Sequence, residues 1–114
     1  MYALKNKVQL VGHLGAAAEI KEISSGKKVA NFSLATNETW RDANGEKKEE
    51  TQWHRLVAWG KVAELVEKYT TKGSELMIEG KLIHRSYDTK EGEKRYITEI
   101  EVKEVLLMGG KQTA

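Results

Sequence analysis

Residues 51–73, TQWHRLVAWGKVAELVEKYTTKG, join a strand pattern to a helix pattern and decide the fold. Residues 51–59 alternate in character from one position to the next, which is typical of a strand. Over residues 61–72, apolar side chains recur at spacings of three and four, as in an amphipathic helix that faces a core: Val62, Leu65, Val66 and Tyr69. We expect this helix to end with Lys72 in its last turn, because Gly73 follows as a stop signal.

Further strand patterns flank this stretch and are separated by glycines and polar clusters: residues 5–14, 19–23, 28–37, 75–87 and 94–107. Gly12 lies inside the first strand, where a glycine often marks a bulge or a sharp bend. The polar run 38–50 surrounds Asn44-Gly45, a strong hairpin signal in which both residues tolerate positive φ. We therefore expect solvated loops at 38–50 and 88–94.

The order of these elements predicts the architecture. One helix between the third and fourth strands of a five-stranded set, with 19–23 as a short addition, indicates an all-β chain with the OB-fold, a small Greek-key barrel. Another five-stranded barrel and an α+β sandwich remain alternatives. We expect one OB-fold domain over residues 1–108, followed by a short tail at 109–114.

Composition narrows the class of protein. The chain has 114 residues, which suits one domain, and its net charge is +2, from 19 Lys and Arg against 17 Asp and Glu. Without cysteine it has no disulfide, thiol nucleophile or thiolate metal site, and a reducing cytosolic compartment is the simplest setting. No apolar run is long enough to span a membrane, and no secretory signal is visible. Any binding of a polyanion must depend on local clusters of cations.

Side-chain parity along residues 51–59 gives such a cluster. Trp53, Arg55 and Trp59 share one face with Val57, while the opposite face carries His54, Leu56 and Ala58. A guanidinium between two indoles is unusual for a core face. The next strand and the preceding hairpin extend the pattern, so that four aromatics interleave with four cations: Trp40, Trp53, Trp59, Tyr87, Arg41, Arg55, Lys81 and Arg85.

Single-stranded nucleic acid requires this combination. Unpaired bases stack on aromatic rings, at about 1–3 kcal/mol per base, and cations follow the phosphates. In the alternative interpretation, the aromatics are packing residues, and Arg55 and Arg85 cap the barrel ends or pair with Glu79 or Glu99.

Catalytic patterns are missing from the sequence. The three histidines, His13, His54 and His84, lie on separate strands without metal-ligand spacing. No phosphate-binding glycine loop and no nucleophile elbow occurs. We expect no enzymatic activity, no metal and no cofactor.

Six ordered blocks resemble the bacterial single-stranded DNA-binding protein family over nearly the whole chain: residues 6–15, 29–36, 40–42, 53–55, 60–61 and 78–80. The resemblance implies a cytoplasmic OB-fold homotetramer that wraps single-stranded DNA during replication, recombination and repair.

The resemblance also implies roles for residues at matching positions. It implies base stacking by Trp40, Trp53, Trp59 (where Phe is commoner) and Tyr87 (where Trp is usual). It implies phosphate contacts along the path of the strand for Lys7, Arg55, Lys61, Lys72 and Arg85, to which the pattern adds Arg41. It implies a subunit interface that includes His54 and the first strand, with Asn6, Val8 and Leu10.

The chain departs from the family pattern at three places. Ala16-Ala17-Ala18 replaces a stretch that commonly holds Asp-Pro, and His13 stands where Asn is frequent. The sequence stops at Ala114, where the family continues into a polar linker and an acidic tip that recruits other proteins. Recruitment of replication and repair proteins through that tip is therefore doubtful for this chain.

Two other functions remain open at this point. One is an OB-fold module that binds proteins through its aromatic face, and the other is an accessory protein of replication restart. RNA in place of DNA is a variant of the main hypothesis, because stacking alone hardly separates the two.

Overall fold

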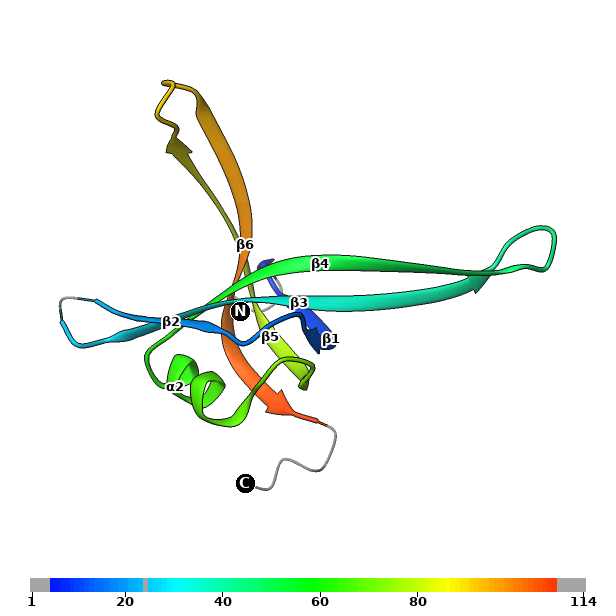
Figure 1. The fold of residues 1–114 in the computed structure, drawn as a ribbon, viewed down its shortest axis with the longest axis horizontal. Helices are drawn as coiled ribbons and strands as arrows, with labels where there is room; N and C mark the ends of the chain where they lie inside the picture. Colours follow the sequence, from blue (N-terminus) through cyan, green and yellow to red (C-terminus); the bar gives the residue numbers. More distant parts are fainter. Residues whose placement is uncertain (1–4, 24, 109–114) are drawn as a thin grey trace.

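The computed structural model describes residues 5–23 and 25–108, which form six strands and a helix (Figure 1). Their order along the chain is β1 (Val8–Leu14), β2 (Glu19–Glu22), β3 (Lys28–Arg41), β4 (Lys47–Trp59), α2 (Gly60–Tyr69), β5 (Glu75–Asp88) and β6 (Lys94–Leu107).

The strands form one sheet in the order β1-β5-β6-β4-β3-β2, and an additional pairing of β1 with β3 closes it. The closing contact consists of His13 opposite Ala35 and Leu14 opposite Leu34. All neighbours are antiparallel except β4 and β6, which are parallel. Five strands thus make the barrel and β2 adds an edge to β3, so the predicted OB-fold with a single inserted helix is confirmed.

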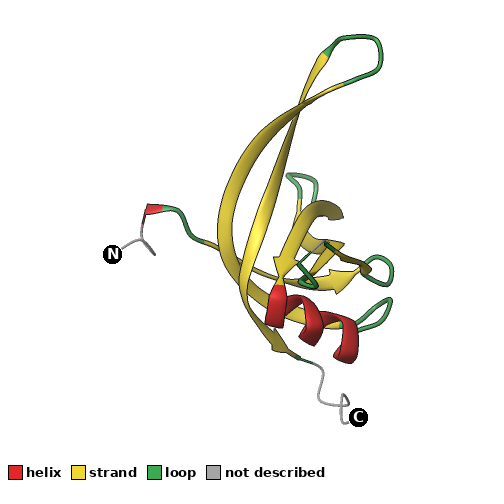
Figure 2. Cartoon of the chain, turned by 90° about the vertical axis from the view of Figure 1, so that its left-hand side faces the viewer, coloured by secondary structure: helices red, strands yellow, loops and turns green. Residues whose placement is uncertain are grey.

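The barrel interior includes the face of residues 51–59 that alternation placed opposite Trp53 and Arg55. Phe32 and Leu34 from β3 and Leu56 from β4 are buried in one cluster with residues of the other strands. Helix α2 covers one end of this core through Ala63 and Val66, on the side away from the tip of the β5–β6 hairpin (Figure 2).

The helix is shorter than predicted. It ends at Tyr69 because Thr70 adopts extended backbone, while its N–H and its hydroxyl both donate to the Val66 carbonyl oxygen. Lys72 therefore lies in the following turn rather than in the last helical turn. Tyr69 is exposed, with Lys68 Nζ 5.6 Å from the ring centre, so its assignment to the apolar stripe was wrong.

Gly12 lets two strands approach closely. A Cβ at this position would collide with the Ala35 carbonyl oxygen of β3, where the barrel closes. The register shift of the sheet lies elsewhere, between Glu79 and Gly80 of β5.

The polar run 38–50 is not a loop, which corrects the sequence-based expectation. β3 and β4 remain paired as far as Arg41 opposite Lys47, so only residues 42–46 form the turn. The paired residues 38–41 and 47–50 lie beyond the barrel core. Backbone hydrogen bonds between the two strands hold them in place, without burial of apolar side chains. We call residues 37–51 the β3–β4 arm; it projects from the barrel (Figure 1).

A second hairpin, β5–β6, projects in another direction, with Asp88 opposite Lys94 at its end. The turns of the two hairpins close in the same way. The Gly45 N–H donates to the Asp42 carbonyl, and the Gly92 N–H donates to the Thr89 carbonyl. Each glycine has positive φ, whereas Asn44 does not. The predicted hairpin at Asn44-Gly45 is confirmed, with only the glycine left-handed.

Candidate nucleic-acid interface

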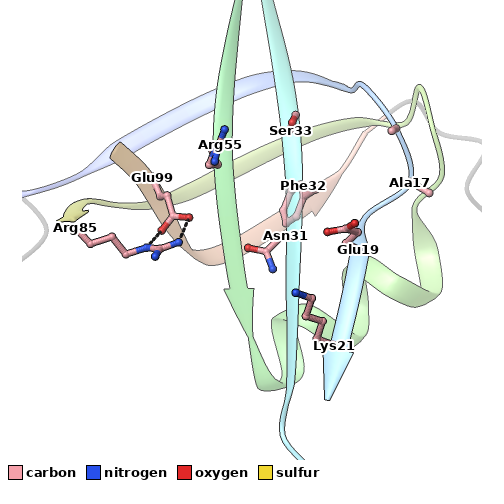
Figure 3. Close-up of a pocket in the computed structure, with 10 residues that line it drawn as sticks. Ala17, Glu19, Lys21, Asn31, Phe32, Ser33, Arg55, Arg85 and Glu99 are labelled. Carbon is pink, nitrogen blue, oxygen red and sulfur yellow. Dashed lines mark hydrogen bonds and ion pairs between the residues drawn. The ribbon is translucent and has the colours of Figure 1, made fainter. Parts of the chain in front are cut away.

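A groove crosses the outer face of the barrel over β2, β3, β4, β5 and β6. Its largest hollow measures about 580 Å³ and is lined by polar and charged side chains from all five strands, including Glu19, Lys21, Asn31, Ser33, Arg55 and Arg85 (Figure 3). A hollow of about 430 Å³ adjoins it at Trp59, and one of about 220 Å³ adjoins it at Trp53. Glu99 lines all three, which makes them one continuous surface.

Trp53 and Trp59 mark the two ends of this groove on β4. Trp53 is 61% exposed and Trp59 is 39% exposed, so both indoles present surface to solvent. Five residues lie between them, so the two positions are six steps apart along the strand, which corresponds to about 20 Å. Trp53 rests on Gly15, because a Cβ there would lie 2.5 Å from Cζ3 of the indole. The barrel itself therefore holds a flat aromatic surface at each end of the groove.

Arg55 lies between the two indoles and is exposed. No described residue, in 5–23 or 25–108, makes an ion pair or hydrogen bond with its side chain. Its positive charge is thus available to a ligand in the groove.

Unlike Arg55, Arg85 forms an ion pair with Glu99. The Arg85 Nε donates to Glu99 Oε1 at 2.9 Å and its Nη2 donates to Oε2 at 3.0 Å (Figure 3). This hydrogen bonding and the negative charge of Glu99 raise the pKa of Arg85 above its ordinary value. The alternative that Arg85 pairs with Glu99 is confirmed, whereas Arg55 pairs with neither Glu79 nor Glu99 in the described structure.

The aromatics of the hairpins lie apart from the groove lining. Tyr87 is exposed on β5, on the same face as Arg85 and two residues closer to the hairpin tip. Trp40 is exposed on the β3–β4 arm, but the unbroken register places it on the opposite face of the ribbon from Trp53. The structure therefore does not join all four predicted aromatics on one face.

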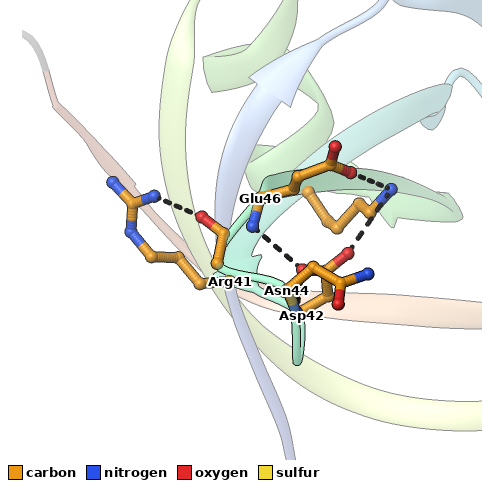
Figure 4. A network of polar contacts seen from close by, with 6 residues as sticks. Arg41, Asp42, Asn44 and Glu46 are labelled. Atoms are coloured by element: carbon orange, nitrogen blue, oxygen red, sulfur yellow. Dashed lines mark hydrogen bonds and ion pairs between the residues drawn. The ribbon is translucent and has the colours of Figure 1, made fainter.

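Arg41 is the last residue of β3 and contacts the turn of the β3–β4 arm. Its Nη1 donates to the Gly45 carbonyl at 2.9 Å, while Asp42 Oδ1 accepts from the N–H groups of Asn44 and Glu46 (Figure 4). Lys48 adds ion pairs to Asp42 and Glu46. Arg41 thus fixes the shape of the tip in this structure.

The remaining predicted cations do not line the groove. Lys81 Nζ lies 3.7 Å from Glu101 Oε1 and Lys81 lines none of the three hollows, so we leave it out of the binding site. Lys7 precedes β1, and its Nζ lies 3.7 Å from Glu79 Oε2. Glu79 belongs to a separate outer face formed by β1, β5 and β6. Lys61 and Lys72 are exposed near the two ends of helix α2.

The residues predicted at a subunit interface have partners within the chain. Val8 and Leu10 are partly buried against the core. The Asn6 amide pairs with the backbone of Leu82 through two hydrogen bonds, and His54 Nε2 lies 2.9 Å from Thr36 Oγ1.

The sequence comparison decides the family, because residues 5–108 match the Single-strand binding protein family. The chain belongs to this family. It is 47% identical over 109 residues to "Single-stranded DNA-binding protein 1" of Chlorobaculum tepidum, covering 95% of this chain and 67% of that protein. It is 45% identical over 108 residues to "Single-stranded DNA-binding protein 1" of Xylella fastidiosa, covering 94% and 79%.

Solved structures agree. The chain superposes with a TM-score of 0.84 and 38% identity on the SSB of Plasmodium falciparum in complex with ssDNA, covering 91% of this chain and 95% of that one. It also superposes with a TM-score of 0.79 on a deletion mutant of the single-stranded DNA-binding protein from Thermus aquaticus. That match is 24% identical and covers 93% of this chain and 51% of the other, and it supports the fold alone.

Membership in a family of non-enzymatic DNA-binding proteins confirms the expectation that the chain is no enzyme. Within residues 5–23 and 25–108, no group of three or more His, Asp or Glu side chains is placed to hold a metal ion. The described part of the chain also contains no helix long and apolar enough to cross a membrane. The predicted tail at 109–114 lies outside the described residues.

Sequence reasoning missed several residues of the groove. Asn31 and Ser33 alternate with the buried Phe32 and Leu34 and line the groove, and no sequence pattern had suggested a role for them. Gly15 was noticed only as the end of a family block. Glu99 was considered only as a possible partner of Arg55 or Arg85, and no local pattern predicted its burial.

Proposed function

We propose that this chain binds single-stranded DNA without regard to base sequence, in DNA replication, recombination and repair. Bases stack on Trp53 and Trp59, and Arg55 between them meets a phosphate. One observation carries this proposal: two exposed indoles and an unpaired guanidinium share one face of the barrel. The names of the two bacterial relatives and the ssDNA complex of the Plasmodium protein support the same ligand.

The geometry favours a single strand over a duplex. A single strand exposes the faces of its bases, which stack on aromatic rings for about 1–3 kcal/mol each. A duplex hides those faces in its own stack, so the two indoles would gain little from it. The net charge of +2 is also small, so affinity depends on a few local cations and on stacking.

A longer strand would leave the groove and meet the outlying residues. Tyr87 continues the face of Arg85 along β5, and Trp40 and Arg41 present a further aromatic and a further cation on the β3–β4 arm. Lys7, Lys61 and Lys72 offer exposed charge elsewhere on the barrel surface. We assign these residues to the extended path of the strand, outside the stacking groove.

We further propose that the chain assembles as a homotetramer in the cytoplasm of a bacterial cell, on nucleoid DNA. β1 supports self-association, because residues 8–12 pair only with β5 and have no partner strand on their other edge in the described structure. A second copy of β1 fits that edge, and the contribution of Val8 and Leu10 is then backbone pairing. The outer face beside it exposes apolar Val11 and Leu106.

Tryptophan fluorescence during titration with oligo-dT tests the ligand. We expect strong quenching by oligo-dT, weakening as salt rises, and little quenching by a duplex of equal length. Trp53→Ala should lower the affinity by about 1–3 kcal/mol with the fold intact. Tyr96→Ala is the matched control, since Tyr96 is highly exposed on the other face of the β5–β6 hairpin.

Unchanged affinity in a folded Trp53→Ala protein would contradict the stacking assignment. Absence of quenching by any strand would favour a protein-binding module in place of DNA binding. Titration with oligo-U in parallel measures the preference for DNA over RNA. Sedimentation equilibrium tests the assembly, and a monomer at micromolar concentration would contradict it.

A further inference from the structure

The groove contains a buried negative charge, which is unexpected on a surface that binds a polyanion. Glu99 is only 4% exposed, although its side chain belongs to the outer face of β6, opposite Ile83 of β5. Both of its carboxylate oxygens accept from Arg85, and no other described residue makes a hydrogen bond or ion pair with them. Arg85 is therefore the one group in the described structure that compensates this charge.

This pairing restricts what Arg85 can do for a bound strand. A shift of its guanidinium toward a phosphate would leave a buried carboxylate without a partner, which is strongly unfavourable. While it stays paired, its charge is cancelled by Glu99, and a neutral unit attracts phosphates weakly. A cation placed to neutralise phosphate would be built as Arg55 is, exposed and unpaired.

The pair offers a flat surface in a fixed orientation instead. A bidentate contact with a carboxylate holds the guanidinium in one plane, and only its Nε and Nη2 edge is used. The Arg85 side chain remains 55% exposed. Arg85 lines the hollow at Trp59 and also the larger hollow that contains Arg55 (Figure 3), so its guanidinium lies within the groove next to the Trp59 end. Guanidinium planes, like aromatic rings, stack on unpaired bases.

Resting on the function proposed above, we propose that Arg85, locked in place by Glu99, is a third stacking platform of the groove and contacts a base, not a phosphate. Glu99 acts as a positioning residue that sets the plane of the guanidinium.

The same two strands provide a matched control. Lys81 and Glu101 form an ion pair of the same charges on β5 and β6, with Nζ 3.7 Å from Oε1. A lysine has no plane, its contact here is to a single carboxylate oxygen, and neither residue lines the groove hollows. Replacing this pair changes the charges equally without removing a platform.

The test compares Arg85→Gln/Glu99→Gln with Lys81→Gln/Glu101→Gln, both of which leave the net charge unchanged. Affinity for oligo-dT is measured by tryptophan quenching at several salt concentrations. Affinity for an abasic deoxyribose-phosphate strand of equal length, which has no bases to quench the indoles, is measured by its competition with oligo-dT. Arg85→Lys is added because it keeps a cation on Glu99 and removes only the plane. Far-ultraviolet circular dichroism and thermal unfolding establish that each variant is folded.

We expect the Arg85/Glu99 variant to bind oligo-dT about tenfold more weakly than the unmodified protein, with the same dependence of log affinity on log salt concentration. It should bind the abasic strand as tightly as the unmodified protein does. Arg85→Lys should lose about as much affinity for oligo-dT, and the Lys81/Glu101 variant should bind oligo-dT as tightly as the unmodified protein. A salt slope smaller by about 0.7 would mark Arg85 as a phosphate contact and overturn the assignment. Unchanged affinity would also overturn it, as would full retention by Arg85→Lys.

These outcomes are distinct from failure of the proposed function. If the unmodified protein fails to bind oligo-dT, or Trp53→Ala binds as it does, then the stacking groove is itself wrong. If both behave as expected and only the Arg85 variants do not, the assignment of Arg85 alone falls.

Discussion

The barrel face and the β3–β4 arm both carry an exposed tryptophan, but they hold it in different ways. Trp53 rests on Gly15 of the closed barrel, beside strands whose other face is the buried core. Trp40 stands on a two-stranded ribbon with no core behind it and on the opposite ribbon face. The difference shows that residue type and exposure do not define a binding platform, since the support beneath the ring decides whether its position is fixed before the ligand arrives.

Substitution of Gly12 in β1 and of Gly15 just after it should have the largest effects, and it tests whether the barrel fixes the position of Trp53. Gly12→Ala should lower the free energy of unfolding by about 1–3 kcal/mol, because the new methyl group meets the Ala35 backbone where the barrel closes. Gly15→Ala meets the tip of the Trp53 ring, which can move. The free energy of unfolding should then change by less than about 0.5 kcal/mol. Affinity for oligo-dT should fall, because the indole no longer packs on Gly15.

Urea unfolding and fluorescence titration of both variants check this pair. If Gly15→Ala binds oligo-dT as tightly as the unmodified protein does, packing on Gly15 does not position Trp53 for binding. The same conclusion follows if both glycine variants lose only stability.

Shortening the β3–β4 arm sharpens the comparison. Replacement of residues 38–50 by Asn-Gly joins Asn37 to Thr51, which are paired in the ladder and hydrogen-bonded through their side chains. Because this segment contributes nothing to the buried core, we expect stability to change by less than about 1 kcal/mol. Affinity for an oligonucleotide just long enough for the groove should persist, and affinity for long strands should fall.

Titrations with a series of oligo-dT lengths measure this effect. Equal losses for the shortest and longest strands would contradict the division between a fixed groove and an outlying arm.

The smallest expected effect concerns the ion pair that ties helix α2 to β3 beneath the groove. Glu67 accepts a hydrogen bond from Lys28 at 2.9 Å, and this bond and its charge raise the pKa of Lys28 above the ordinary 10.5. A raised pKa in the folded state stabilises the protein below that ordinary value, and the benefit disappears as pH rises through the folded-state pKa. Glu67→Gln should therefore melt slightly lower at neutral pH, and the two melting curves should converge in strong alkali.

Thermal melts across this pH range provide the measurement, with Glu91→Gln on the β5–β6 turn as the control. A difference in melting temperature that persists above the titration of Lys28 would show that Glu67 stabilises the helix by another route.

Alternation and spacing predicted most of the barrel. The core faces of β3 and β4 follow from a period of two, although Val29, Ala35 and Val57 on the opposite faces are buried as well. The same parity placed Trp53, Arg55 and Trp59 together on the outer face. The predicted roles of these residues stay predictions, since they concern a ligand.

Other features depend on contacts that a local pattern does not record. Residues 38–50 are polar on both ribbon faces, so the sequence carried no periodic signal for the paired arm. The face of Trp40 follows only from the unbroken register through that arm. The buried Glu99 is paired with Arg85, which lies fourteen positions away and on another strand. The helix ends early because Thr70 turns its own groups back to Val66.

The sheet order also governs how the chain reaches its fold. The β3–β4 and β5–β6 hairpins join neighbouring segments, whereas β1 finds its main partner in β5, more than sixty residues later. Its pairing with β3 covers only two positions. On a ribosome, β1 must therefore wait unpaired until most of the chain has emerged, and the parallel contact of β4 with β6 waits longer still. We expect barrel closure to be the slow, late step of folding, and nascent β1 to be the segment most exposed to mispairing with other chains.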